Sequence, residues 1–326
     1  MTSDANCNRS EGSPSRIPED RTRLKVGDLA WGADRAAVVA ALRLDQLALI
    51  QRIPDPATAD TLLADVASAL GLLDKLKLQA GFASIQGHRE LVSRYFMTVN
   101  RRADYQFIPP HSEGDARTGI QLGALYCVQN TTDGGENILF NTHPASPAWA
   151  RLRAVVKKVD AGGRPLGPRE TAMLRALHGI KLPEDLAAPG ANVIDEAPTQ
   201  VPGIRLYRVL EPVSPLHSVI LGRDVPVYWD NVSSFDIDCG AEFMEFLQTT
   251  LSLREPAGGV RLAAIDVDHS CRVWRSGVHL ADIFAARITH KLQPGELLLF
   301  NNLTWAHATN NWTPRSGQRT VLAAFA

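Results

Sequence analysis

The chain has few of the features that identify the more easily recognised classes of protein. No stretch approaches the roughly 18 consecutive apolar residues of a membrane-spanning helix, and no G-x-G-x-x-G fingerprint follows an expected strand. With 34 Lys and Arg against 35 Asp and Glu, the chain has no basic excess that would attract nucleic acid. The first twenty residues are polar and have no apolar core like that of a signal peptide. We therefore expect a cytoplasmic protein with no nucleic-acid or membrane partner.

Cysteine is scarce and scattered. The four cysteines form no C-x-x-C pair, which argues against a structural zinc site and a disulfide framework. Cys127 stands in the apolar run 122–128, where a buried thiol acting as a small hydrophobic side chain is expected. The eight regular strand–helix alternations of a TIM barrel are also absent.

The composition predicts one globular domain. At 326 residues and 45% hydrophobic, the chain has ample material for a single core. Residues 1–22 are rich in Ser, Asn, Pro, Arg and Glu, so we expect a disordered tail there. Residues 23–326 then form the domain, with a helical and loop insert at about 144–255.

The N-terminal part of the domain is predicted to be helical. Asp34 can cap an Ala- and Leu-rich helix over residues 35–53, and Thr58 or Asp60 opens a second helix with apolar residues at helical spacing. These helices would form an outer scaffold. Within the insert, residues 149–159 and 241–253 are expected to be helical, and the Pro-rich segment 183–203 to be a loop.

Strands are predicted on both sides of the insert. Residues 119–129 and 136–140 flank an Asp-Gly-Gly turn and predict a hairpin. Further strands are expected at 260–267, 283–289, 296–300 and 320–325. This order predicts a mainly β fold with flanking helices, built as one antiparallel barrel whose first and last strands meet.

The tripeptide His111-Ser112-Glu113 follows two prolines. In an extended segment, residues two apart point to the same face. One imidazole and one carboxylate make up two of the three ligands of the 2-His-1-carboxylate site that holds non-heme Fe(II). A solvated turn is the alternative, because nine His and 35 acidic residues can form this tripeptide by chance. The third ligand should be a distant His near a late strand, and His307 stands there.

Three other segments accompany the tripeptide. They are Gly134-Gly135-Glu136-Asn137, the run from Pro294 through Trp305 to His307, and Thr313-Pro314-Arg315-Ser316-Gly317-Gln318-Arg319 before the last strand. In this order and spacing, residues 90–326 resemble the taurine dioxygenase/clavaminate synthase-like superfamily of Fe(II)- and 2-oxoglutarate-dependent oxygenases. The resemblance implies a double-stranded β-helix (jelly-roll, cupin-like) core that uses Fe(II), 2-oxoglutarate and O₂.

The resemblance also assigns residues. Iron would be held by His111, Glu113 and His307, and an Arg before the last strand would bind the distal carboxylate of 2-oxoglutarate. Arg319 is the preferred candidate because strand alternation can point it inward. Arg315 lies in turn-forming sequence and would face the substrate or solvent. Asn137 stands where many relatives have a Thr that assists the 2-oxoglutarate carboxylate.

Glu113 narrows the resemblance further. Glu as the iron carboxylate is shared with clavaminate synthase and the asparagine and arginine β-hydroxylases, whereas the related halogenases lack this carboxylate. We therefore expect hydroxylation of an unactivated C–H bond in an amino acid or amino-acid-like small molecule, free or presented on a carrier protein. A sulfonate or aryloxyacetate dioxygenase is the alternative substrate class, and a non-catalytic metal-binding jelly-roll is the alternative function.

Further residues have less specific contexts. Gln121 begins a barrel strand and is a candidate to point into the cavity. Arg101 and Arg102 could reach a substrate carboxylate or be solvated, and Trp305 is expected to pack in the core. Six further histidines have no ligand context: His143, His178, His217, His269, His279 and His290.

Overall fold

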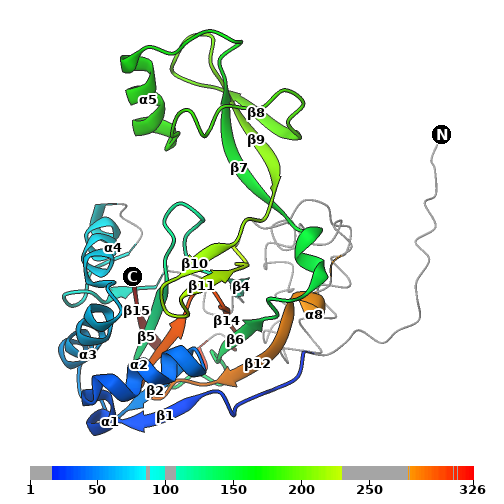
Figure 1. Cartoon of the computed structure of the whole chain (residues 1–326). Coiled ribbons are helices and arrows are strands. Elements are labelled where there is room, and N and C mark those ends of the chain that lie inside the picture. The colour runs from blue at the N-terminus through cyan, green and yellow to red at the C-terminus, as the bar shows by residue number, and fades with distance from the viewer. Residues whose placement is uncertain are drawn as a thin grey trace.

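The fold is described by a computed structural model that covers residues 17–85, 89–99, 108–229, 278, 280–310, 312–313 and 315–326 (Figure 1). No helix of these residues is long and apolar enough to cross a membrane. The helix expected at 241–253 and the strand expected at 260–267 lie outside the described residues.

Two sheets organise the chain. The larger has the strand order β1-β2-β13-β5-β15-β3 and the smaller the order β12-β6-β14-β4. The larger sheet consists of β1 (Lys25–Asp28), β2 (Leu47–Gln51), β3 (Met97–Thr98), β5 (Leu122–Asn130), β13 (Leu297–Asn301) and β15 (Arg319–Phe325). The smaller sheet consists of β4 (Ile108–His111), β6 (Asn137–Thr142), β12 (Phe284–His290) and β14 (Trp305–Thr309).

The predicted hairpin is wrong, although both of its strands exist. β5 pairs with β13 and β15, whereas β6 pairs with β12 and β14. Every residue of β6 is buried, as are most of β5, so each strand needs neighbours on both edges and cover on both faces. The Asp-Gly-Gly turn therefore carries the chain from one sheet to the other.

A shared apolar core lies between the two sheets. Trp305 and Leu139 from the smaller sheet pack with Leu49, Phe300 and Cys127 from the larger one, and all are buried. Trp305 is thus a packing residue, as predicted. Burial raises the pKa of the Cys127 thiol to about 11, so Cys127 is a neutral core residue, also as predicted.

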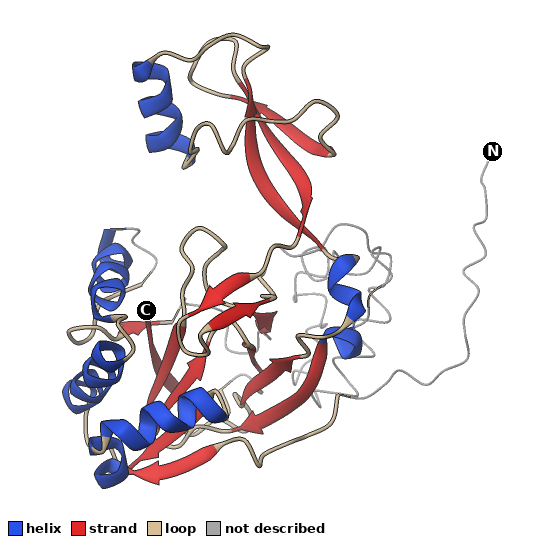
Figure 2. Cartoon of the chain, viewed as in Figure 1, coloured by secondary structure: helices blue, strands red, loops and turns tan. Residues whose placement is uncertain are grey.

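Helices cover the outer face of the larger sheet, as the sequence predicted (Figure 2). They are α2 (Arg35–Leu44), α3 (Pro56–Ala69) and α4 (Leu73–Ile85), with the short α1 (Leu29–Ala33) before them. Their buried residues form one cluster with the outward-facing residues of β2, β5, β13 and β15. The coarse architecture is therefore mainly β with flanking helices.

The long first helix predicted over residues 35–53 is wrong in its second half. α2 begins after its predicted cap, Asp34, but it ends at Leu44, and β2 follows. Gln46 has a φ of 67°, a left-handed conformation that ends a helix. Leu47 to Ile50 are all buried and lie between β1 and β13, which a helix could not do.

The second predicted helix exists, but its predicted start is wrong. Asp55 caps α3 by accepting a hydrogen bond from the backbone N–H of Thr58. Asp60 is buried inside the helix and accepts hydrogen bonds from the backbone N–H groups of Arg94 and Tyr95. These hydrogen bonds hold residues 94–95 against α3.

The predicted N-terminal tail is ordered near its end. Ile17 is buried, and the backbone N–H groups of Asp20 and Arg287 form hydrogen bonds that join the segment to β12. Residues 17–22 are therefore not a disordered tail. Residues 1–16 lie outside the described part of the chain.

The insert contains an arm that stands off the body of the molecule (Figure 1). The arm, residues 153–212, consists of β7 (Arg153–Asp160), α5 (Pro168–His178), β8 (Val193–Pro198) and β9 (Arg205–Pro212), with the sheet order β7-β9-β8. The helix predicted at 149–159 is wrong, because only a 3-10 turn at Pro147–Ala150 precedes β7, which pairs with β9 along its whole length. The loop predicted at 183–203 contains β8.

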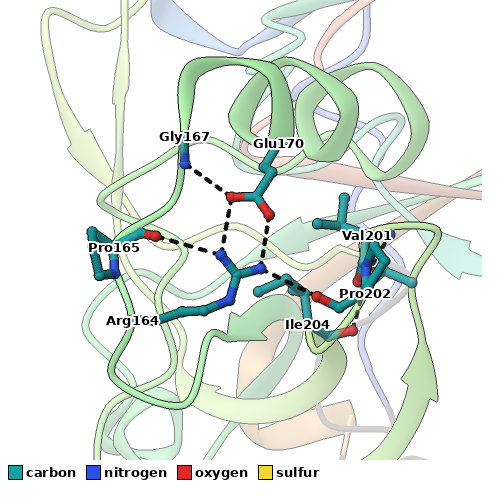
Figure 3. A network of polar contacts seen from close by, with 8 residues as sticks. Arg164, Pro165, Gly167, Glu170, Val201, Pro202 and Ile204 are labelled. Atoms are coloured by element: carbon teal, nitrogen blue, oxygen red, sulfur yellow. Dashed lines mark hydrogen bonds and ion pairs between the residues drawn. The ribbon is translucent and has the colours of Figure 1, made fainter.

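The arm has a small core and a local polar network of its own. Leu174, Ile180 and Ile204 are buried in it. Arg164 forms an ion pair with Glu170 and donates a hydrogen bond to the Pro202 carbonyl, and Glu170 accepts a hydrogen bond from Gly167 N–H at the start of α5 (Figure 3). After the arm, β10 (Leu216–Ser218) and β11 (Arg223–Val225) form a hairpin, and α8 (Leu280–Ile283) leads into β12.

Candidate metal centre

Strand pairing brings the two histidines together. His111 ends β4 and His307 lies in β14, and the two residues are direct partners in the antiparallel register. Directly opposed residues point to the same face of a sheet, and their rings lie 4.2 Å apart, centroid to centroid. Two residues that stand on either side of the insert in the sequence thus present imidazoles to one point.

Glu113 completes the cluster. Its Oε1 lies 3.7 Å from Nε2 of His111 and 3.7 Å from Nε2 of His307. One ligand atom from each of the three residues lies within 4.8 Å of the others, the one such metal-capable group among the described residues. The structure therefore brings together the three residues that the sequence nominated.

A buried amide fixes the backbone at Glu113. Asn302, in the loop between β13 and β14, accepts a hydrogen bond from Glu113 N–H at 2.9 Å and donates to the Glu113 carbonyl at 3.0 Å. The same amide donates to the Ile120 carbonyl at 2.9 Å, and Asn302 is fully buried. The Asn302 side chain therefore forms the two backbone hydrogen bonds with Glu113 that a neighbouring strand would otherwise form. The sequence showed Asn302 before His307 but gave no sign of this role.

The arm also reaches the segment that follows Glu113. Arg117 donates hydrogen bonds to the Gly179 carbonyl and to Asp185, the latter at 2.6 Å from Nη2 to Oδ2. Asp185 is itself buried and accepts a second hydrogen bond from Lys181 N–H at 2.6 Å. The loop that follows His111-Ser112-Glu113 is therefore held by hydrogen bonds at two points: Glu113 bonds to Asn302, and Arg117 bonds to the arm.

The electrostatics favour a metal-ready protonation state. Burial and then the nearby His111 lower the pKa of His307, so its imidazole is neutral at pH 7. Burial alone would raise the pKa of Glu113, but the hydrogen bond and charge of His111, with His307 and Arg89, hold it below its usual value. A neutral imidazole and an ionised carboxylate are the forms that coordinate a metal.

The donor set fits a first-row divalent metal. Two adjacent ligands on bonds of about 2.1 Å would lie about 3 Å apart, so the 3.7 Å separations are slightly wider than those of a loaded site. Two imidazoles and one carboxylate with open positions are the donor set of non-heme Fe(II) oxygenases. The triad lines a cavity, so the open positions face space in which a ligand could bind.

Arg319 and Asn137 line the same cavity. The guanidinium donates to the Gly135 carbonyl at 3.1 Å and to Asn137 Oδ1 at 3.3 Å. Burial lowers the pKa of Arg319 to about 10, which leaves it charged at pH 7. Asn137 thus orients Arg319, and no described carboxylate forms an ion pair with this buried guanidinium.

Arg315 does not line this cavity. It is exposed and has a φ of 66°, in keeping with the turn chemistry of its sequence. Of the two arginines before the last strand, the structure places Arg319 at the cavity and Arg315 in solvent. Pro314 lies outside the described residues.

Trp312 and Arg89 were missed by the sequence analysis. The Arg319 guanidinium lies 5.8 Å from the centroid of the Trp312 ring, a cation–π distance. Arg89 lines the cavity, and its Nη2 lies 3.5 Å from Glu113 Oε1. No sequence motif marks Arg89, which precedes the tripeptide by more than twenty residues. Arg101 and Arg102, the arginines considered for a substrate, lie outside the described residues.

Gln121 does not point into the cavity, so its predicted role there is wrong. The side chain is buried and donates to the His217 carbonyl at 3.1 Å, while its Oε1 accepts from Val219 N–H at 3.1 Å. Gln121 therefore ties the start of β5 to the β10–β11 hairpin. These hydrogen bonds satisfy the amide of Gln121, which is buried and would otherwise lack partners.

The other described histidines belong to no group that could hold a metal. His178, His217 and His290 hydrogen bond to Gln200, Asp224 and Glu296, and His143 is exposed. His269 and His279 lie outside the described residues.

Comparisons with known proteins give a consistent but distant resemblance. No protein-family model matches the chain, and no curated protein matches it. Among solved structures, the chain is similar to PvcB, an Fe, alpha-ketoglutarate dependent oxygenase from an isonitrile synthetic pathway, known in Pseudomonas aeruginosa, at 11% identity and a TM-score of 0.42 over 98% of this chain and 94% of that one. It is also similar to AAD-2 in complex with Mn(II) and N-oxalylglycine, at 11% identity and a TM-score of 0.44 over 95% and 96% of the two chains. At these low scores, the functional assignment depends on the geometry of the site itself.

Proposed function

We propose that the chain is an Fe(II)- and 2-oxoglutarate-dependent oxygenase that hydroxylates an unactivated C–H bond of an amino acid or amino-acid-like small molecule. The observation that carries the proposal is the charge arrangement of one cavity. His111, Glu113 and His307 converge on one side of it, and Arg319 lines it too, buried and without a described carboxylate partner. A buried guanidinium is costly unless an anion pairs with it. A ligand that binds both groups must have a metal-binding end and an anionic end, as 2-oxoglutarate does.

We infer that the two sheets form a double-stranded β-helix. In support, β5 and β6 follow each other in the sequence but lie in opposite sheets, and β13 and β14 do the same. Chain crossings of this kind, with a shared core between the sheets, are typical of a jelly-roll. Both of the ligand-bearing strands, β4 and β14, belong to the smaller sheet.

The residues of the chain would divide the work of the reaction. His111, Glu113 and His307 would hold the metal, which supplies O₂ activation coupled to the decarboxylation of 2-oxoglutarate to succinate and CO₂. Arg319, oriented by Asn137 and Trp312, would bind the distal carboxylate of 2-oxoglutarate with two directional hydrogen bonds. Glu113 occupies the ligand position that halide takes in related halogenases, so the proposed outcome is hydroxylation.

The alternative of a non-catalytic metal-binding module has less support. Such a module needs only the triad, whereas Arg319 in the same cavity has no role in holding a metal. The chemistry of the cavity therefore favours an enzyme with an anionic co-substrate.

Succinate formation tests the proposal. The purified full chain, supplied with Fe(II), ascorbate and 2-oxoglutarate, should produce succinate slowly without a prime substrate and faster when a suitable amino acid is added. Arg319→Ala should abolish most of this turnover, and Arg315→Ala, a matched control in the adjacent turn, should retain it. If the iron-loaded chain forms no succinate with any amino acid tested and does not bind 2-oxoglutarate, the proposed function is wrong.

A further inference from the structure

Two loops pack together beside the start of β15. The Asp-Gly-Gly turn, residues 131–136, leads from β5 to β6, and residues 315–318 lead into β15. Thr131 N–H donates to the Gln318 carbonyl at 2.9 Å, and Thr131 Oγ1 accepts from Gln318 N–H at 2.9 Å. A Cβ on Gly317 would lie 2.5 Å from the carbonyl carbon of Thr131, so this close approach requires glycine. The turn and the segment before β15 therefore form one packed unit.

The carboxylate of Asp133 joins the turn to the chain around Thr313. Its Oδ1 accepts from Thr313 N–H at 2.8 Å and from the Ser316 hydroxyl at 3.0 Å, and Asp133 N–H donates to Ser316 Oγ at 3.2 Å. Ser316 N–H also donates to the Thr313 carbonyl at 3.0 Å. A carboxylate accepts stronger hydrogen bonds than a neutral group does. Asp133 therefore fixes the position of Thr313 and, through the peptide bond, that of Trp312.

Trp312 contacts the guanidinium of Arg319. The guanidinium carbon lies 5.8 Å from the centre of the Trp312 ring, a cation–π distance. Nε of Arg319 donates to the Gly135 carbonyl and Nη2 to Asn137 Oδ1. A Cβ on Gly135 would lie 2.8 Å from Arg319 Cδ. The turn thus supplies one partner of the guanidinium directly, Gly135, and through Asp133 it holds another.

The orientation of Arg319 matters because these contacts leave Nη1 for a ligand. Neither hydrogen bond uses Nη1, and no group in the described part of the chain accepts from it. A carboxylate bound by two parallel N–H bonds requires an aligned guanidinium plane. Arg has several rotatable bonds, so this alignment needs support from neighbouring groups. The ring face of Trp312 limits rotation of the plane.

We propose that Asp133 is a positioning residue for the co-substrate. By holding Thr313 and Trp312, it keeps the Arg319 guanidinium in the orientation that binds the distal carboxylate of 2-oxoglutarate. This inference rests on the proposed function and deepens it. Neither Asp133 nor Trp312 is among the residues that line the cavity, so their effect on a ligand must pass through Arg319.

The test compares two ligands on the full chain loaded with Mn(II). N-oxalylglycine is a non-reacting analogue of 2-oxoglutarate, and its methyl ester at the glycine end keeps the metal-binding oxalyl group but has no distal charge. The unmodified chain should bind the acid at least about 30-fold more tightly than the ester in calorimetry, because Arg319 pairs only with the acid. This ratio, the acid preference, reports on Arg319, and the ester affinity reports on the metal.

Substitutions at two positions should lower the acid preference. Asp133→Ala should lower it by about 3- to 10-fold, and Asp133→Asn, whose amide oxygen can accept the same hydrogen bonds, should retain most of it. Trp312→Leu should lower it by about 5- to 30-fold, and Trp312→Phe should retain part of it because a ring face remains. The ester affinity should be unchanged in all four variants.

The direction of the effect separates position from charge. Loss of a negative charge near Arg319 would by Coulomb's law tighten the binding of an anion, so weaker binding of the acid to Asp133→Ala identifies the lost hydrogen bonds. Asp55→Ala is the matched control, because Asp55 also accepts from a backbone N–H, at the start of α3, and does not line the cavity. Its acid preference should equal that of the unmodified chain, even where its stability falls.

Three results would overturn the inference: an unchanged or increased acid preference in Asp133→Ala, the same in Trp312→Leu, or equal losses for the acid and the ester. If Asp133→Ala does not fold, Ser316→Ala takes its place, because it removes one of the two donors to Asp133 Oδ1. An unchanged acid preference there overturns the inference too. Equal binding of the acid and the ester by the unmodified chain would instead refute the proposed function, because Arg319 would then not be an anchor.

Discussion

The polar side chains of the cavity include metal ligands, which donate electron pairs, and arginines, which donate hydrogen bonds. His111, Glu113 and His307 present lone pairs to one point, whereas Arg319 and Arg89 present N–H groups. The first set suits a cation and the second suits anions. A ligand that bridges the two sets is therefore held at both ends.

Removing any of the three lone-pair donors should remove the metal. His111→Ala, Glu113→Ala and His307→Ala should each lose tight Mn(II) or Fe(II) binding, because two ligands with open water positions hold such ions poorly. The fold should persist, because the apolar core between the sheets does not depend on these residues. Metal content after gel filtration and circular dichroism measure the two effects. Full metal content in all three variants would contradict the assignment.

The co-substrate anchor can be assigned by comparing two arginines. Truncating one partner of a buried charge pair costs roughly 2–5 kcal/mol, which corresponds to about 30- to 3,000-fold in affinity. Arg319→Ala should weaken 2-oxoglutarate binding by at least about 30-fold, and Arg319→Lys should restore only part of it because the planar fork is lost. Arg315→Ala, in exposed turn sequence, should bind 2-oxoglutarate normally. If Arg315→Ala lost more 2-oxoglutarate affinity than Arg319→Ala, Arg315 would be the anchor of the co-substrate instead.

The sequence names residues of the cavity where a motif ties chemistry to order in the chain; the structure brings these residues together, and their roles stay predictions. His111, Glu113, His307 and Arg319 were found because spacing and residue type carry their signal. Arg89, Trp312 and Asn302 were missed because their roles depend on which distant segments meet in the fold. Gln121 was misplaced because a buried amide follows its nearest unpaired backbone groups, which here belong to residues 217–219.

At the scale of elements, the boundaries of helices and loops decide where the functional groups lie. α2 stops at Leu44 so that β2 can enter the larger sheet beside β13, and the loop after β13 carries Asn302 to Glu113. The end of α2 does not follow from local helix propensity, because residues 35–53 are rich in good helix formers throughout. Burial of Leu47 to Ile50 on both faces outweighs that propensity.

The end of α2 can be tested by changing Gln46. A left-handed conformation costs an L-residue about 1–2 kcal/mol, and glycine avoids most of this cost. Gln46→Gly should therefore raise the free energy of unfolding by about 0.5–1 kcal/mol, measured in urea. Arg43→Gly, three residues earlier and inside the helix, should lower it by about 1 kcal/mol. A destabilised Gln46→Gly protein would mean that the Gln46 side chain matters more than its backbone.

The loop amide gives a second prediction at this scale. Asn302→Ala leaves the backbone N–H of Glu113 and the carbonyls of Glu113 and Ile120 without the partners seen in the structure. Each unsatisfied buried group costs about 1–3 kcal/mol, so the midpoint of thermal unfolding should fall clearly. Mn(II) affinity should also fall, although Asn302 is not a ligand. Asn310→Ala, a buried amide in the loop that follows β14, is the control for Mn(II) affinity. Unchanged metal affinity in Asn302→Ala would show that the amide stabilises the fold only.

At the scale of the whole molecule, buried carboxylates make stability depend on pH. Burial alone would raise the pKa of Glu296, but hydrogen bonds from His290, Gln293 N–H and Gln51 outweigh burial and lower it. A depressed folded-state pKa adds stability that is fully present above the unfolded-state value of about 4.3 and is lost as the pH falls through the folded-state value. The metal-free protein should therefore unfold more easily below about pH 4.3.

Substitution isolates the contribution of Glu296. Glu296→Gln should be less stable than the unmodified chain at pH 7, and its stability should fall less steeply between pH 5 and pH 3. Urea unfolding at several pH values measures both. Glu184→Gln, an exposed carboxylate in the arm, should reproduce the original pH profile. Parallel profiles for Glu296→Gln and the unmodified chain would assign the acid sensitivity to other groups.

Global architecture was predicted better than the pairing of its parts. Alternating apolar strands near 283–289, 296–300 and 320–325 predicted a mainly β fold, and the structure has β12, β13 and β15 there. The hairpin and the helix at 149–159 failed because strand pairing is set by partners far away in the chain. A local turn signal cannot distinguish a return within one sheet from a crossing to another.

The register between His111 and His307 has a consequence for how the protein matures. The two ligands stand on either side of the insert in the sequence and meet only after β14 has paired with β4 and β6. Contacts this distant in sequence form late, because the entropy of closing the long intervening chain must first be overcome. A chain emerging from the ribosome therefore cannot assemble the three-ligand centre until the last strands have been synthesised. Iron would enter a finished fold, and a truncated product would not retain it.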